Sequence, residues 1–248
     1  MLFRKVNKIM KFDITKIRCE HSHTIEEHPA CLLKMLTRFK GKEKPEWYDQ
    51  ARVGYLDIET NNLKPNFAFM FSWAIKRQNK YDDDGKIVKV GETVTDVMKP
   101  ADPFNGNPDT DFHWERQDKR ILGTLGERIL DFDILITFYG SRFDNTFSRS
   151  RALYWKLPWP SYGGIYHLDM YYVVKNKLNL SSNRLESVCE FLGIEGKEKL
   201  KPETWRNAFF GSPNALKEIL SHNVADVAIL EELHMRLEPY LRANKTSI

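Results

Sequence analysis

Two acidic residues lie two positions apart in the segment YLDIET at 55–60, where Asp57 and Glu59 are separated by one isoleucine. Alternate residues of a β-strand point to one face, so a strand here places both carboxylates side by side. Two adjacent like charges are costly, and a divalent cation removes that cost. Carboxylate oxygens suit Mg²⁺ or Mn²⁺. The segment therefore indicates either a metal site or an exposed acid pair on an edge strand.

Two later segments carry residues of the same kind. In FYGSRFD at 138–144, a buried strand leads through a glycine turn to Asp144, which opens a helix. In HNVADV at 222–227, a helix places His222 and Asp226 on one face, because they are four positions apart. Each also has a plain structural explanation, either an N-cap aspartate or a weak surface His–Asp pair. None of the segments establishes a site by itself.

The elements that must position these residues follow from hydrophobic periodicity. An α/β fold is expected, with a mixed sheet flanked by helices, because three strands precede alternating helices and strands. The strands are predicted at 53–58, 67–75, 87–97, 134–138 and 166–169. The helices are predicted at 115–132, 145–154, 169–177, 184–192 and 213–237.

Composition supports one sizeable core, since 42% of the 248 residues are hydrophobic and 29% are charged. A polar stretch at 41–50 indicates a boundary, so we expect a basic appendage over 1–50 and one domain over 51–248. Residues 1–50 hold 11 Lys and Arg against 7 Asp and Glu, which accounts for the net charge of +4. Such an arm can contact phosphates or be a solvated tail.

Neither a membrane span nor a secretory signal is predicted. No apolar run approaches the roughly 20 residues that cross a bilayer, and the first residues lack an apolar core and a cleavage site. The three cysteines are too few for a disulfide scaffold. We therefore expect a reducing, cytoplasmic setting.

Several potential zinc ligands are crowded into the appendage. Zinc favours four Cys or His ligands, but the spacing here matches no common zinc pattern and contains no C-x₂-C pair. The alternative is a small appendage that docks on the domain or binds nucleic acid. The candidate ligands are Cys19, His21, His23, His28 and Cys31.

In their order along the chain, YLDIET, FYGSRFD and HNVADV resemble the three motifs of the DEDD (DnaQ-like) 3′–5′ exonucleases of the ribonuclease-H-like superfamily. The resemblance is nearest to the YprB-like predicted exonucleases and the proofreading domains of family B polymerases. It extends to YHLD at 166–169 and to 185–193 and 205–210, and it covers about residues 52–240. It implies a sheet in which three antiparallel strands precede parallel ones.

The resemblance also implies roles for particular residues. Four carboxylates would hold two Mg²⁺ or Mn²⁺ ions for phosphodiester hydrolysis, and a histidine would be the general base. In the family this base is a tyrosine four residues before the last aspartate or a histidine five residues before it, whereas this chain has a histidine at the tyrosine spacing. The metal carboxylates are Asp57, Glu59, Asp144 and Asp226, and the base is His222.

The chain departs from the family at two other places. The first motif usually continues Thr-Gly-Leu but here reads Asn61-Asn62-Leu63, and the second usually has asparagine where Tyr139 stands. Asparagine tolerates a left-handed backbone better than most residues, so the first change can preserve the turn. A further acid, Asp169, is expected to be structural, as a helix cap.

Substrate contacts are expected near these motifs. Apolar or aromatic side chains can hold a terminal base, and arginine or lysine can follow phosphates. The alternatives are core packing for Phe143 and a solvated helix face for the basic residues. The candidates are Asn61, Leu63, Phe143 and Arg142, with Arg149, Arg151 and Lys156 as further phosphate contacts.

The leading expectation is a metal-dependent 3′–5′ exonuclease that acts on single-stranded DNA or RNA ends. A structure-selective endonuclease of the same superfamily and a non-catalytic nucleic-acid-binding module are the alternatives. The four acids argue against the last, because an inactive fold has no physical reason to gather them. The choice between DNA and RNA stays open.

Overall fold

A computed structural model of the protein describes residues 23–24, 52–82, 84–99, 118–161, 165–196 and 199–241. The predicted appendage lies outside these residues, apart from His23 and Thr24, and so do the candidate zinc ligands other than His23. No helix within the described ranges is long and apolar enough to cross a membrane.

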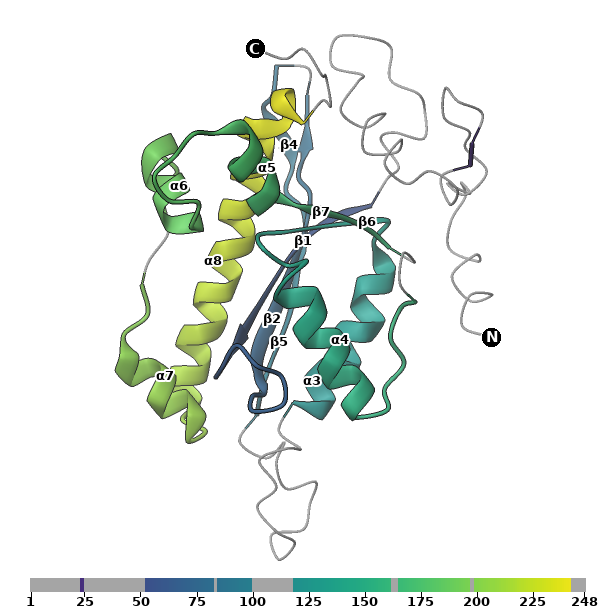
Figure 1. The fold of residues 1–248 in the computed structure, drawn as a ribbon, viewed down its shortest axis with the longest axis vertical. Coiled ribbons are helices and arrows are strands. Elements are labelled where there is room, and N and C mark those ends of the chain that lie inside the picture. Colours follow the sequence, from purple (N-terminus) through teal and green to yellow (C-terminus); the bar gives the residue numbers. More distant parts are fainter. Residues whose placement is uncertain are drawn as a thin grey trace, which may run out of the picture.

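The centre of the molecule is a five-stranded sheet in the order β5-β2-β1-β6-β7 (Figure 1). β1 pairs antiparallel with β2, which pairs antiparallel with β5, whereas β6 and β7 continue the sheet in parallel from β1. The predicted fold class is therefore confirmed, with antiparallel strands followed by parallel ones. The strands are β1 (Val53–Thr60), β2 (Met70–Arg77), β5 (Thr93–Val97), β6 (Ile134–Thr137) and β7 (Tyr166–Asp169).

Helices cover both faces of this sheet (Figure 1). One face is covered by α3 (Lys119–Arg128), which ends in a 3₁₀ turn at Ile129–Asp131, and by α4 (Asp144–Tyr154). On the other side lie α5 (Met170–Lys177), α6 (Leu185–Leu192), α7 (Pro202–Phe209) and α8 (Pro213–Leu237), with a 3₁₀ turn at Glu238–Tyr240.

The alternation of β1 decides which side chains face which helices. Leu56 and Ile58 belong to a core cluster that includes Leu125 of α3, whereas Tyr55 belongs to a second cluster that includes Leu230 of α8. Asp57 and Glu59 share the parity of Tyr55, so β1 presents its two carboxylates towards α8. Packing of alternate residues into two cores thus determines the direction of both acids.

The predicted strand at 87–97 is divided in the structure. β4 (Ile87–Lys89) pairs with β3 (Lys80–Tyr81) in a separate hairpin, and only β5 joins the main sheet. Gly91 lies between β4 and β5, and a Cβ there would be 1.8 Å from the Arg77 carbonyl oxygen. Only glycine permits this close passage of two backbones, which ends one hairpin and starts the next strand.

α7 was not among the predicted helices. It is a short helix with proline at its first turn, and aromatic contacts hold its end: Phe209 stacks on Phe69, with ring centroids 5.7 Å apart. Because short helices are marginal alone, tertiary packing rather than local pattern accounts for it. The much longer α8 was predicted within its observed bounds, and Ser212 caps it by accepting a hydrogen bond from the Ala215 amide.

Candidate metal centre

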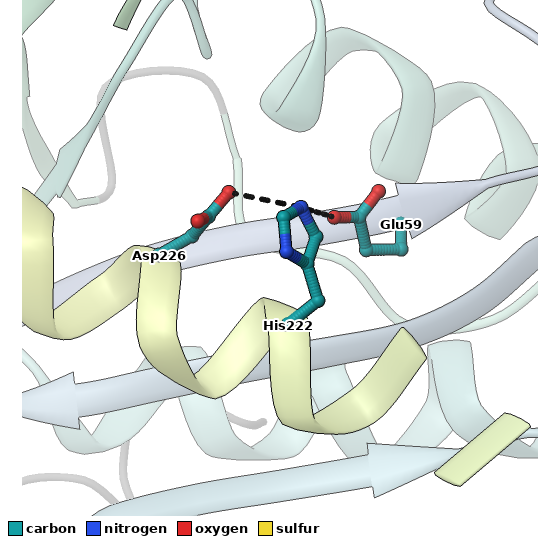
Figure 2. Close-up of side chains that lie close together, drawn as sticks. All are labelled: Glu59, His222 and Asp226. Atoms are coloured by element: carbon teal, nitrogen blue, oxygen red, sulfur yellow. Dashed lines mark ion pairs between the residues drawn. The ribbon is translucent and has the colours of Figure 1, made fainter. Parts of the chain in front are cut away.

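Three of the predicted residues come together between β1 and α8. His222 Nε2 lies 3.7 Å from Glu59 Oε1 and 3.7 Å from Asp226 Oδ2. One ligand atom from each residue lies within 4.8 Å of the others, and Figure 2 shows the imidazole between the two carboxylates. All three side chains are at most 15% exposed. The strand parity of β1 and the i,i+4 spacing of α8 therefore produce one group that can hold a cation.

Asp57, on the same face of β1 as Glu59, is bound by a residue of α8. Asn223 Nδ2 donates a 2.5 Å hydrogen bond to Asp57 Oδ2, and Ser72 Oγ on β2 donates a 3.4 Å bond to Asn223 Oδ1. Asn223 is fully buried. This asparagine holds the Asp57 carboxylate, yet the sequence analysis assigned it no role. Its residue type did not single it out, because Asp226, Glu231 and His234 are also polar and buried on α8.

Asp144 approaches from α4 at the edge of β1. The parallel pairing of β1 with β6 ends at Tyr55 opposite Ile136, so the later amides on that edge need other acceptors. The Ile58 amide donates to Asp144 Oδ1 at 3.2 Å. The Asp144 side chain therefore lies beside the backbone that joins Asp57 to Glu59.

Burial sets the protonation behaviour of Asp144. The residue is 3% exposed, and this desolvation raises the pKa of its carboxyl to about 7, with a smaller contribution from the charge of Asp169. Two backbone hydrogen bonds, from its own amide and that of Ile58, oppose the rise. A bound cation would favour the charged form of this buried acid.

Asp169 holds the turn that delivers Asp144. Its carboxylate accepts hydrogen bonds from the Tyr139 amide at 2.7 Å and from the Ser141 amide at 3.0 Å and hydroxyl at 2.5 Å. It also accepts from the Tyr171 amide as the N-cap of α5, so the predicted cap is confirmed. Tyr139 has a φ of 68°, a conformation that asparagine tolerates better than tyrosine. The turn at Tyr139 is therefore strained, and the hydrogen bonds to Asp169 restrain it.

The predicted substrate residues have different environments. Leu63 is 72% exposed, and Asn61 accepts a hydrogen bond from the Phe69 amide, which extends the pairing of β1 with β2. Phe143 packs against the core with its ring 5.7 Å from Phe147. The exposed loop after β1 also carries a residue that the sequence analysis missed, Phe67, which is 77% exposed.

The basic candidates also differ. Arg142 is at the surface, and its Nε donates to the Tyr172 hydroxyl at 3.2 Å, which raises the pKa of its guanidinium. Arg151, in contrast, is buried and forms an ion pair of 2.7 Å with Asp118, which also accepts a bond from the Trp155 indole. The expectation that Arg151 binds phosphate is therefore wrong, because α4 turns this side chain into the core.

Comparisons with known proteins agree with this architecture. Residues 109–238, just over half of the chain, match the RNase H superfamily. The family B DNA polymerase of the hyperthermophilic archaeon Pyrobaculum calidifontis has a similar fold, with a TM-score of 0.56 and 19% sequence identity. The similarity covers 77% of this chain and 25% of the polymerase, so this chain spans about a quarter of its length. No curated protein sequence matches the chain.

Proposed function

This chain belongs to the RNase H superfamily, and from this premise we propose that it is a nuclease that hydrolyses phosphodiester bonds with divalent metal ions. More specifically, we propose a 3′–5′ exonuclease of the DEDD type that acts on single-stranded DNA or RNA ends. The specific form rests on the order and spacing of the three motifs, since fold similarity alone does not determine function.

One observation carries the proposal: Glu59 of β1 and Asp226 of α8, which are far apart in the chain, lie around the same histidine, and Asp57 and Asp144 each contact α8 or β1 nearby. Glu59 and Asp226 flank the same imidazole nitrogen, Asp57 is tied to α8 through Asn223, and Asp144 reaches the β1 backbone. Buried carboxylates in one place are costly without a counter-charge. A divalent cation is the counter-charge that suits their oxygen atoms.

The residues present fit such a cation. Two ligands at about 2.1 Å from one ion lie at most about 4.2 Å apart, and the two separations of 3.7 Å meet this limit. Glu59 and Asp226 would hold one ion, Asp144 the second, and Asp57 would be shared. When bound, the ions supply Lewis-acid stabilisation of phosphate and a lower pKa for water.

The remaining proposed roles concern the nucleic acid. Leu63 and Phe67 expose apolar surface on the loop that follows β1, which suits packing against a terminal base without reading its identity. Arg142 is exposed near the start of α4 and can contact a phosphate. These features support binding of an unpaired strand close to the carboxylates.

The function is tested with 3′-labelled and 5′-labelled single-stranded DNA and RNA, each incubated with Mg²⁺, Mn²⁺ or EDTA. Stepwise shortening from the 3′ end that EDTA abolishes is the expected result. Internal cuts would support the endonuclease alternative, and retention without cleavage would support a binding module. The Asp57→Asn variant, purified in parallel, controls for contaminating nuclease.

A further inference from the structure

The Nε2 atom of His222 faces two carboxylate oxygens, one from Glu59 and one from Asp226 (Figure 2). The distances of 3.7 Å to Glu59 and Asp226 are longer than a hydrogen bond. They are within the separation expected for two ligands of a single ion at about 2.1 Å each. Each carboxylate oxygen can therefore share an ion with the histidine nitrogen, and all three atoms lie within 4.8 Å of one another.

One nitrogen lone pair cannot bind a cation and accept a proton at the same time. A histidine that acts as a base normally directs one nitrogen at the reacting proton while its other nitrogen is held by an orienting group. Here, the nitrogen that points away from the α8 backbone is the one between the carboxylates. A ligand role uses this nitrogen as it is placed, because it lies between the two other donors.

The spacing in α8 gives the reason for this placement. His222 is one helical turn before Asp226, so the two side chains lie one above the other on the face that meets Glu59 of β1. A histidine five positions before the aspartate would be rotated by about 100° around the helix. The four-residue spacing therefore places the imidazole between the carboxylates of Glu59 and Asp226.

We propose that His222 is a metal ligand, so that His222, Glu59 and Asp226 form a mixed nitrogen–oxygen site that prefers Mn²⁺ to Mg²⁺. The inference rests on the proposed metal-dependent function and assigns a different role to the histidine within it. Imidazole favours first-row transition metals, whereas Mg²⁺ favours oxygen ligands and retains water. The site should accordingly discriminate between the two ions.

The direct test is pulsed EPR of the full chain loaded with Mn²⁺. Electron spin-echo modulation from a directly bound ¹⁴N nucleus is expected in the wild type and should be lost in His222→Ala. His234→Gln is the matched control, because residue 234 is on the same helix, about 18 Å further along its axis at 1.5 Å per residue. This control should keep the nitrogen signal.

Titration calorimetry with Mn²⁺ and with Mg²⁺ gives a second readout. His222→Ala should weaken Mn²⁺ binding at least about 10-fold and Mg²⁺ binding less than about 3-fold. Asp226→Asn should weaken both ions to a similar degree, since a carboxylate suits either. Thermal melts in EDTA establish that each variant is folded.

The possible outcomes separate the two proposals. Mn²⁺ binding without a ¹⁴N signal from the wild type would overturn the ligand role while the metal-dependent function stands. Equal losses of Mn²⁺ and Mg²⁺ in His222→Ala would overturn the selectivity. If the wild type binds neither ion, both the ligand role and the metal-dependent function are wrong.

Discussion

The two ends of the interface between α8 and the sheet differ in how their acidic side chains are neutralised. At the paired end, defined by Tyr55, Lys76, Tyr81, Glu231 and His234, the Glu231 carboxylate forms an ion pair with Lys76 and accepts a bond from the Tyr81 hydroxyl. At the acidic end, defined by Asp57, Glu59, His222 and Asp226, the Glu59 and Asp226 carboxylates lie on either side of His222 and the Asp57 carboxylate is bound by Asn223. The same helix and strands can therefore neutralise an acid within the protein, and at the acidic end they gather acids instead.

The two histidines of this interface make the same contrast. His234 is buried, and its Nδ1 lies 2.9 Å from the Tyr55 hydroxyl; burial lowers the pKa of its imidazole to about 4. It is a neutral hydrogen-bonding residue in the core. His222 instead adjoins two carboxylates. A cluster of charged side chains is therefore evidence for function only where ion pairs or hydrogen bonds within the protein do not already neutralise it.

The largest expected effect is on catalysis at the acidic end. Asp57→Asn keeps a group that can accept the hydrogen bond from Asn223 but removes a metal-binding charge. We expect nuclease activity to fall more than about 10³-fold, because bound metal contributes several kcal/mol of transition-state stabilisation. The melting temperature in EDTA should stay the same or rise. Activity within 10-fold of the wild type would contradict the assignment of Asp57.

At the paired end, the largest effect should be on stability. Lys76→Met leaves the buried Glu231 carboxylate without its cation, and we expect the free energy of unfolding to fall by about 3–5 kcal/mol. Urea denaturation measures the change. Activity per folded molecule should be retained, since Lys76 lies outside the proposed centre. The double variant Lys76→Met with Glu231→Leu should recover much of the loss, and a failure to recover would mean that packing rather than charge was disturbed.

His234 should make the protein less stable in acid. Its pKa is about 4 in the folded state and about 6.5 when unfolded, so the unfolded chain binds more protons between these values. The contribution is fully present above pH 6.5 and is lost as the pH falls towards 4, by about 3 kcal/mol. His234→Gln should flatten this part of the stability curve in urea melts. An unchanged slope would show that other groups dominate acid unfolding.

Asp144 should give the opposite pH dependence of stability, with a smaller effect than that of His234. Its pKa rises from 3.8 to about 7 on folding, so the folded chain binds more protons between these values. Its contribution is fully present below pH 3.8 and is lost as the pH rises through 7. In EDTA at pH 8, Asp144→Asn should be more stable than the wild type by about 1–3 kcal/mol, with little difference at pH 4. Excess Mn²⁺ should favour the wild type.

Much of the fold could be predicted from local pattern. Alternation gave the strand at 53–58 and the direction of its acids, and helical periodicity with a serine cap gave α8. The break near Gly91 and the short helix α7 could not be predicted. Both depend on remote groups, the Arg77 carbonyl and the Phe69 ring, which no local pattern contains.

For the centre itself, the sequence alone determined which residue types share a face: Asp57 with Glu59 by strand parity, and His222 with Asp226 by helix spacing. The tertiary structure decided how these pairs meet, that Asn223 holds Asp57, that Asp144 bonds the β1 edge, and that Arg151 lies in the core. The physical reason is one of range. Backbone geometry fixes side-chain directions within an element, whereas distances between elements result from the packing of two cores drawn from the whole domain.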